Sequence, residues 1–232
     1  AGVKVLGKRM LDFLAGKGCR VDRERGIAFM DAAVVDAALA TVPRTFDVFD
    51  RTGRPAFVLG DRAPKMAPGH NAIHWLAGAP GRTRASRIAD VELFARICQK
   101  LEAIHMIGIP VMPQDAPNPQ AKLLYGIKAC VENSTKPIYF STDRASVNVA
   151  AIRLLAAAFE GDMAKRPYGI SQLSPTSPLY WEEGVCDALE RTVLQSVPLA
   201  ILPEPNAGVS APYTLAGLLV MNNAECLSGI VM

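Results

Sequence analysis

The feature that most constrains the fold of this chain is a recurrence of short apolar segments. Their starts lie roughly 30 residues apart, and each follows a stretch in which apolar side chains have helical spacing. Because the apolar residues are continuous rather than alternating, we expect strands of a parallel sheet that is buried on both faces. The segments are MIGIPVM, PIYFS, YGISQLS and PLAILP, at residues 106–112, 137–141, 168–174 and 198–203.

Helices are predicted between these strands. A strand–helix unit of about 30 residues is the repeat of a (β/α)8 barrel, in which eight units share roughly 250 residues. We therefore expect an α/β fold of the TIM (β/α)8 type, of which this chain holds about four βα units. The predicted helices cover residues 86–102, 119–132, 146–159 and 182–195.

A doubly wound open sheet is the alternative arrangement of such units. It usually carries a glycine-rich turn after its first strand, whereas this chain has MPQDAPNP at residues 112–119. The barrel is therefore favoured. Since an open half barrel leaves strand edges unpaired, we expect a fragment of a longer protein, or a chain that completes its barrel by association.

The part before residue 86 is α+β in character. Apolar spacing predicts helices over residues 3–15 and 31–41, and Asp31 is suited to cap the second. TFDVFDR and PAFVLG flank a turn and predict a β-hairpin over residues 45–60. Residues 61–85 lack a clear period and are interpreted as a long loop.

These patterns divide the chain into two parts. Residues 1–85 form an N-terminal helical and hairpin segment with its long loop, and residues 86–232 form the first half of the barrel.

Composition narrows the class of protein. Apolar residues make up 50% of the chain and charged residues 20%, which is typical of a globular protein with a core. The net charge is +3 and no run of Lys or Arg forms a basic stripe, which argues against nucleic-acid binding. Asn222, Asn223 and Glu225 interrupt the last apolar run before the ~20 residues that a membrane span needs. We expect a soluble, cytoplasmic protein.

Cysteine and histidine offer no pattern for a metal site. The 5 cysteines are widely spaced without a C-x-x-C pair, and the 3 histidines are scattered. We expect reduced thiols and no bound metal.

The loops after the strands are where a barrel places its active site. Glu204 lies between two prolines directly after the fourth strand, where we expect its charge to be fixed and partly desolvated. Asp115 and Asp143 follow the first two strands. Converging carboxylates suit a metal or a cationic substrate, and the lack of a histidine cluster favours the cation. The candidate substrate-binding residues in these loops are Gln114, Asp115, Asp143, Ser174, Thr176, Tyr180, Glu204 and Asn206.

Two alternatives stay open for these loops. Their Pro, Ser, Asp and Asn residues are also the residues that make turns and helix caps. Tyr180, Trp181 and Trp75 offer aromatic faces to a quaternary ammonium group, although each can equally pack in the core.

No Ser-His-Asp order, G-x-S-x-G or P-loop motif identifies a catalytic residue.

Two motifs near the end of the chain carry a family resemblance. LSPTSPLYW is followed by a proline-bounded segment from Ala207 to Gly217, with Asn223, Ala224 and Glu225 beyond it. Together with DRTGRPAFVLG and ENSTKPI, these motifs resemble the trimethylamine–corrinoid methyltransferase family, which includes a non-pyrrolysine glycine betaine branch.

The resemblance implies a TIM barrel of about twice this length and a specific reaction. A methyl group would pass from a methylated amine to the Co(I) of a separate corrinoid protein, with no cofactor bound directly and a homo-oligomeric enzyme. Glu204 stands where the family often has an apolar residue such as Met, so the preferred amine stays open. The pyrrolysine position of the trimethylamine enzymes lies beyond residue 232.

The resemblance also gives a role to the last loop. Residues 206–212 are predicted to form a tight turn, with a helix that starts at Pro212 or Tyr213. Ala207, Gly208 and Ser210 are small, so a corrinoid could approach this loop closely. The alternatives are a lyase-type barrel enzyme, for which Arg144 is the cationic candidate, and a substrate-binding paralogue without catalysis.

Overall fold

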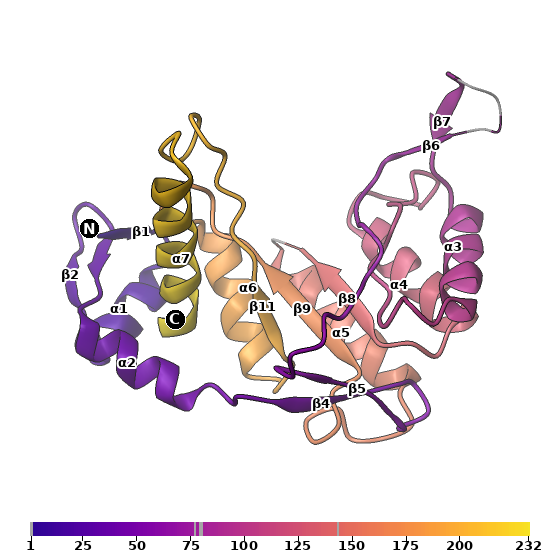
Figure 1. Ribbon diagram of the computed structural model, residues 1–232, viewed down its shortest axis with the longest axis horizontal. Coiled ribbons are helices and arrows are strands. Elements are labelled where there is room, and N and C mark those ends of the chain that lie inside the picture. The colour runs from indigo at the N-terminus through magenta and orange to yellow at the C-terminus, as the bar shows by residue number, and fades with distance from the viewer. Residues whose placement is uncertain (1, 77, 79–80, 143) are drawn as a thin grey trace.

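A parallel sheet with flanking helices forms the centre of the molecule (Figure 1). The computed structural model describes residues 2–76, 78, 81–142 and 144–232. Strands β8 (Ile138–Ser141), β9 (Gly169–Leu173) and β11 (Leu199–Ile201) pair in the order β11-β9-β8, and both pairings are parallel. The parallel arrangement predicted from the apolar segments is therefore confirmed for these three strands.

The first predicted strand, at residues 106–112, is mostly wrong. Only Ile107 joins the sheet: its N–H donates to the Pro137 carbonyl at 2.8 Å, and its carbonyl accepts from Tyr139 N at 2.9 Å. Pro110 lacks an N–H to continue the ladder. The next residues pair instead with the preceding loop, where Asn71 N donates to the Ile109 carbonyl and Met112 N to that of Ala72.

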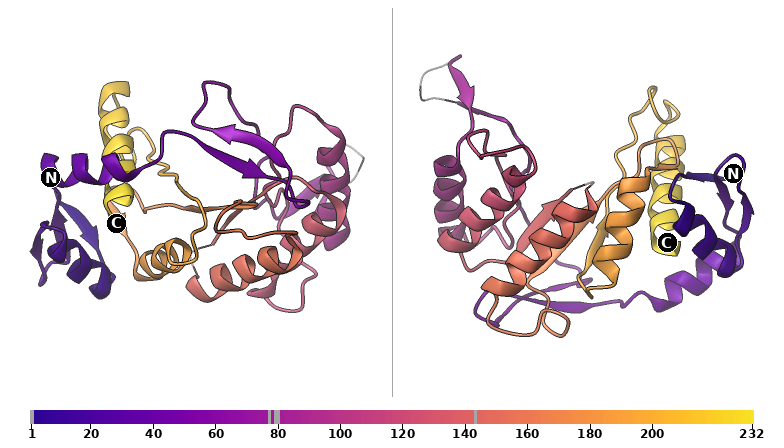
Figure 2. Two further views of the ribbon diagram at one scale, coloured as in Figure 1. Left: turned by 90° about the horizontal axis from the view of Figure 1, so that it is seen from below. Right: turned by 180° about the vertical axis from the view of Figure 1, so that it is seen from behind.

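The predicted helices are present and pack side by side in chain order, the later ones against one face of the sheet (Figure 2). The first three share a core with β8 that includes Ile127, Phe140 and Leu155. The fourth packs in a separate cluster with Leu173 of β9. The helices are α3 (Ile88–Lys100), α4 (Ala121–Asn133), α5 (Ala145–Ala158) and α6 (Glu183–Val193).

Two of these helices begin two residues later than predicted. The Ser86 hydroxyl donates to the Met112 carbonyl at 2.6 Å, and Asp90 accepts the Arg87 N–H at 2.8 Å, so α3 begins after Arg87. Asn118 accepts the N–H of Ala121 at 2.9 Å and holds the chain before α4.

The pleat of β9 gives each sheet face a different environment. Ser171 faces the helices, where its hydroxyl accepts from Asn148 Nδ2 of α5 at 3.0 Å. Because neighbouring residues point to opposite faces, Ile170 and Gln172 lie on the inner face. The predicted hairpin, formed by β4 (Phe46–Phe49) and β5 (Pro55–Leu59), covers part of that face, where Val48 packs with Ile170. It crosses the lower end of the sheet in Figure 1, whereas the loop after β11 rises at the upper end.

The N-terminal part forms a second sheet, joined by β10 from the loop after β9, in the order β10-β1-β3-β2. The helix predicted over residues 3–15 is partly wrong: residues 3–5 form a strand, and Gly7 separates it from the helix. The cap at Asp31 is confirmed, since its carboxylate accepts Val34 N at 3.0 Å. The elements are β1 (Val3–Val5), α1 (Lys8–Gly16), β2 (Arg20–Asp22), β3 (Ile27–Phe29), α2 (Ala32–Thr41) and β10 (Tyr180–Trp181).

The region interpreted as a long loop contains a hairpin, which corrects the prediction. Strands β6 (His74–Leu76) and β7 (Thr83–Ala85) pair antiparallel, and the hairpin projects from the body (Figure 1). Arg84 binds the Asp90 carboxylate through two 2.7 Å hydrogen bonds at its base. Gly78 and Gly81, which lie between the two strands in the sequence, have φ of 70° and 80°, in the left-handed region that glycine adopts readily.

Helix α7 (Leu215–Val231) follows the loop after β11 and packs on that strand. It begins later than predicted, because Thr214 is the cap and accepts Gly217 N at 3.2 Å. Gly229 lies so close to β11 that an added Cβ would be 2.8 Å from the Ile201 side chain. Within the described residues, no helix combines the length and apolar character needed to cross a membrane.

Candidate functional site

The inner face of the sheet carries polar side chains toward the carboxyl ends of its strands. Ser141 of β8, Gln172 of β9 and Ala200 of β11 are in register, and residues in register on parallel strands point to the same face. Tyr139 lies two residues before Ser141 on the same face of β8 and is in register with Ile170 of β9. Both belong to an apolar cluster with Val48 of the β4–β5 hairpin and Met106, which we call the inner-face cluster. The strands therefore bring a phenol, a hydroxyl and an amide to one face.

Tyr139 and Glu204 form the clearest electrostatic pair of this face. Burial raises the pKa of the Tyr139 phenol, and the negative charge of Glu204 raises that pKa further. The ring of His70 stands edge-on to Tyr139, with centroids 6.0 Å apart. Glu204 itself is exposed. This corrects the expectation that the two flanking prolines leave its charge partly desolvated. The exposed carboxylate thus lies within electrostatic reach of the half-buried Tyr139 phenol.

Gln172 is a residue that sequence reasoning missed. Its side chain is 2% exposed, and its Oε1 accepts no hydrogen bond from the residues that the structure describes. Its Nε2 reaches the Ser174 hydroxyl at 3.5 Å. A polar residue in the otherwise apolar YGISQLS segment was the available signal, since a buried amide costs free energy unless it is paired.

Asp115 and Gln114 serve the neighbouring helices. The Asp115 carboxylate accepts the N–H of Ile88 at 2.9 Å and thereby caps α3. The Gln114 side chain accepts from Lys122 and donates to the Met112 carbonyl at 2.7 Å. Both side chains therefore make structural contacts within loops and helix caps. This agrees with the alternative that the polar residues of these loops serve turns and caps.

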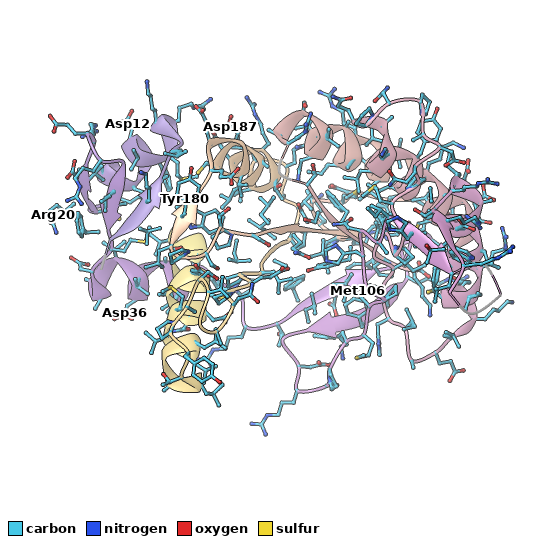
Figure 3. All side chains as sticks on the ribbon, turned by 90° about the horizontal axis from the view of Figure 1, so that it is seen from above. Asp12, Arg20, Asp36, Met106, Tyr180 and Asp187 are labelled. Atoms are coloured by element: carbon cyan, nitrogen blue, oxygen red, sulfur yellow. The ribbon has the colours of Figure 1, made fainter. Side chains whose placement is uncertain are left out.

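The loop after β9 divides its candidate residues between two places. Ser174 is half-buried beside Gln172, and exposed Thr176 donates to Glu182 at 3.1 Å. Tyr180 pairs with Lys4 in the N-terminal sheet. Figure 3 shows it beside α7, across the molecule from Met106, which belongs to the inner-face cluster. The loop places Ser174, and not Tyr180, near the inner face.

The two tryptophans are packed. Trp181 is fully buried and donates from Nε1 to the Ser228 hydroxyl at 2.9 Å. Trp75 meets Phe94 edge-on at 5.4 Å and has the Arg84 guanidinium over its ring. Both tryptophans thus pack against other side chains, which was the alternative to a role in binding an ammonium group.

Residues 206–212 form the predicted tight turn. The Asn206 carbonyl accepts from the N–H groups of residues 209, 210 and 211, and Asn206 N donates to the Ser210 hydroxyl at 2.9 Å. Gly208 has φ of 77°, a conformation that side-chain-bearing residues rarely adopt. Ala207 and Gly208 are exposed, so the turn presents small residues to solvent.

A groove of about 400 Å³ lies at the carboxyl end of β8. Ser141, Thr142 and Asn71 line it with two cationic residues, Lys122 and Arg144. The candidate Asp143 lies outside the described residues. Elsewhere, in the ranges that the structure covers, no three His, Cys, Asp or Glu side chains form a metal site.

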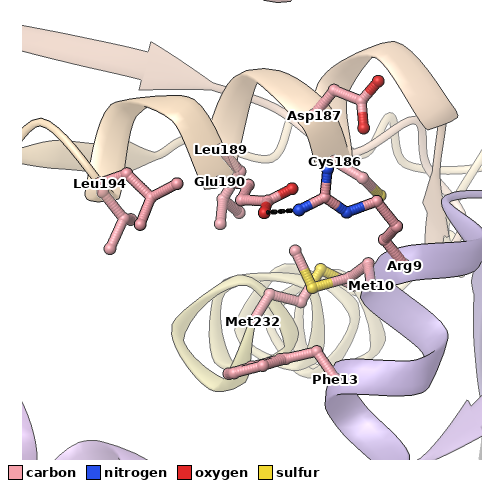
Figure 4. Close-up of a pocket in the computed structure, with 10 residues that line it drawn as sticks. Arg9, Met10, Phe13, Cys186, Asp187, Leu189, Glu190, Leu194 and Met232 are labelled. Atoms are coloured by element: carbon pink, nitrogen blue, oxygen red, sulfur yellow. Dashed lines mark hydrogen bonds and ion pairs between the residues drawn. The ribbon is translucent and has the colours of Figure 1, made fainter.

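An apolar pocket of about 400 Å³ lies between α1 and α6 (Figure 4). Arg9 and Glu190 form a 2.6 Å ion pair across it, over Met10, Phe13 and Met232. Its walls come from helices rather than from the carboxyl ends of strands. We therefore place the candidate site at the inner face and not here.

Comparison with known sequences covers the whole chain. The sequence model of the family described as trimethylamine methyltransferase (MTTB) matches residues 1–232. The chain is 22% identical to a trimethylamine methyltransferase MttB of Desulfitobacterium hafniense, over 100% of this chain and 47% of the relative. It is 26% identical to MttB of Methanosarcina thermophila, over 100% of this chain and 49% of that protein.

A third relative carries another name. The chain is 25% identical to a glycine betaine methyltransferase of Desulfitobacterium hafniense strain Y51, over 99% of this chain and 48% of the relative. The chain thus spans about half the length of the curated relatives that it matches. Because the family match extends over every residue, the chain belongs to the trimethylamine methyltransferase family.

Proposed function

We propose that the complete protein is a (β/α)8-barrel methyltransferase that moves a methyl group from a methylated amine to the Co(I) of a separate corrinoid protein. The observation that carries this proposal is that Tyr139 and Ser141 of β8 lie on the same sheet face as Gln172 of β9, with the Glu204 charge close enough to raise the pKa of the Tyr139 phenol. An aromatic face and a negative charge are the groups that bind a methylated ammonium ion. The parallel βα units and the relatives' names support the same reading.

The reaction is a displacement at a methyl carbon. The acceptor supplies a nucleophilic electron pair on cobalt, so that a carbon–cobalt bond replaces the carbon–nitrogen bond and nitrogen keeps the pair of the broken bond. A quaternary amine leaves as a neutral molecule, whereas a tertiary amine must first gain a proton. The protein has to hold the carbon–nitrogen bond in line with the acceptor, and such positioning lowers the barrier substantially.

The described residues have distinct parts in this scheme. Glu204 provides the counter-charge to the ammonium ion, and Tyr139 provides the ring. Since its pKa is raised, the Tyr139 phenol keeps its proton at neutral pH and adds no second negative charge. Ala207 and Gly208 form a small, exposed surface after the strand edge, which suits the close approach of a large planar acceptor.

The substrate class is tested by binding to the complete enzyme. Calorimetry should compare glycine betaine and trimethylamine with 3,3-dimethylbutyrate, which has the shape of glycine betaine with a neutral carbon in place of nitrogen. Binding of the amines, and at least about tenfold weaker binding of the isostere than of glycine betaine, would support the proposal, because these two ligands differ only in the charge of the trimethyl-bearing group. Equal binding would contradict it.

A second candidate is a lyase-type enzyme that acts on an anionic substrate. The groove at the end of β8 favours it, because Lys122 and Arg144 line that groove. In the same experiment this candidate predicts binding of 3,3-dimethylbutyrate, through its carboxylate, and no binding of trimethylamine.

A further inference from the structure

Helix α7 carries a buried carboxylate that the proposed chemistry does not use. Glu225 is fully buried. In the part of the chain that the structure describes, no Lys, Arg or His forms an ion pair with it. A buried charge is costly unless hydrogen bonds compensate it, so the partners of Glu225 indicate its purpose.

Both carboxylate oxygens of Glu225 accept hydrogen bonds from the loop after β9. The Ser177 hydroxyl donates to Oε2 and the Leu179 N–H donates to Oε1, each at 2.8 Å. Leu179 has φ of 51°, in the left-handed region that residues other than glycine rarely occupy. The carboxylate therefore holds the loop where its backbone is least favourable.

A second contact of the same helix fixes the end of this loop. The Trp181 indole donates to the Ser228 hydroxyl at 2.9 Å, and that hydroxyl donates to the Glu225 carbonyl at 2.8 Å. Glu225 and Ser228 are three residues apart and thus share one helix face. One face of α7 binds the loop at Ser177, Leu179 and Trp181.

This helix also continues directly from the loop after β11. The turn at residues 206–212 leads into the α7 cap at Thr214, and the β9 loop begins at Ser174 beside Gln172. Two loops that follow neighbouring strands are thus connected through one buried side chain. The hydrogen bonds of Glu225 thus fix how these two loops are placed relative to one another.

We propose that Glu225 is a positioning residue that sets the β9 loop against the β11 loop, and thereby determines which methylated amine fits the site. The inference rests on the proposed function for its substrate. The hydrogen bonds, rather than the charge, carry this role. A glutamine at position 225 can accept from Leu179 N with its oxygen and donate to the Ser177 hydroxyl with its amide. A methionine has similar size and can do neither.

The test compares Glu225→Gln, Glu225→Met and Ser177→Ala in the complete enzyme. The measured quantity is the ratio of kcat/KM for trimethylamine to kcat/KM for glycine betaine. Glu225→Gln should keep this ratio within about threefold of wild type, and Glu225→Met should change it by about tenfold or more, since small misplacements have large kinetic effects. Ser177→Ala, which loses one bond, should lie between them.

Several results would overturn the inference. A merely structural role lowers the active fraction equally for both amines, so an unchanged ratio and unchanged KM in Glu225→Met contradict positioning. Glutamine and methionine variants that are equally impaired would show that the hydrogen bonds are not the relevant property.

Failure of the proposed function gives a different signature, which is no methyl transfer by wild type. Hydrogen exchange of the Leu179 amide then decides the positioning role. It should be protected in wild type and Glu225→Gln and should exchange at least about tenfold faster in Glu225→Met, with α5 unchanged. Equal protection in all three proteins refutes the role.

Discussion

The phenol of Tyr139 and the carboxylate of Glu204 come from β8 and from the loop after β11, and they lie close enough for the Glu204 charge to raise the pKa of the phenol. Strand β9 separates their strands in the sheet. The pair therefore spans the inner face. An ammonium ion bound against the Tyr139 ring would be attracted by the Glu204 charge.

Replacing Glu204 by glutamine tests the charge of this pair. Because Glu204 is exposed, we expect Glu204→Gln in the complete enzyme to weaken binding of a quaternary amine by about 1 kcal/mol, which is roughly fivefold. Calorimetry at low and high salt measures the change, which should shrink as salt screens the charge. Asp115→Asn is the matched control, because that carboxylate caps α3 and should leave affinity unchanged. Equal affinity of Glu204→Gln and wild type would count against the pair.

Replacing Gly208 by valine tests the turn after β11. Gly208 has φ of 77° and an added Cβ would lie 3.2 Å from the Tyr213 ring, so Gly208→Val both strains and enlarges the turn. We expect methyl transfer to fall by about tenfold or more, because reacting groups tolerate little displacement. Gly18→Val is the control: its φ of 93° brings a similar strain, but among the described residues apart from its chain neighbours only Val34 comes within 4 Å of the new Cβ, at 3.8 Å. A folded Gly208→Val enzyme with the wild-type rate would show that the loop is only a turn.

The close packing of α7 on β11 gives a prediction about stability. An added Cβ at Gly229 would lie 2.8–2.9 Å from three atoms of Ile201, so Gly229→Ala should lower the free energy of unfolding by about 1–3 kcal/mol. At Gly16, in α1, the described residues outside the adjoining helix backbone bring no atom within 4 Å of the new Cβ. Gly16→Ala should therefore raise that free energy by up to about 1 kcal/mol through helix propensity. Urea denaturation measures both, and equal effects would contradict the packing.

Buried thiols predict a loss of stability in alkali. Burial raises the pKa of Cys130 to about 12 and that of Cys186 to about 11. The folded state thus keeps these thiols protonated when the unfolded state has begun to lose protons, above its ordinary pKa near 9.0. This stability is complete below about pH 9 and is lost as pH rises toward 11–12, by up to about 1.4 kcal/mol per pH unit for each thiol.

The measurement is the free energy of unfolding at about pH 8 and about pH 10.5 for wild type and Cys186→Ala. The variant should lose less stability between the two pH values, because it lacks one of the groups. An identical pH dependence would show that Cys186 does not titrate in this way.

Short-range patterns predicted much of this fold. The period of the apolar segments located β8, β9, β11 and their helices. This was possible because a strand that is buried on both faces consists of a continuous run of apolar residues. The pairing of β1 with β10 was missed, because it joins Val5 to Trp181 and depends on distant sequence. Residues 106–112 have the composition of a strand. Beyond Ile107, however, Ile109 and Met112 form backbone hydrogen bonds with Asn71 and Ala72 of the preceding loop instead of with the sheet.

The site could be predicted only in part. Glu204 was found because a charge followed a buried strand, but its side chain is exposed and not partly desolvated as predicted. Tyr139 and Gln172 were missed, because their facing depends on strand register, which a single strand's sequence does not reveal. Asp115 looked equivalent to Glu204 by position, yet its carboxylate caps α3.

The most direct test of the methyltransferase assignment is methyl transfer itself. The complete enzyme is mixed with a corrinoid protein in its Co(I) state and with trimethylamine or glycine betaine labelled in a methyl group. The account predicts that the label appears on the corrinoid protein in amounts equal to the demethylated amine, and that Glu204→Gln lowers kcat/KM. Failure to transfer label from either amine, with a corrinoid protein that accepts methyl groups from another methyltransferase, would contradict it.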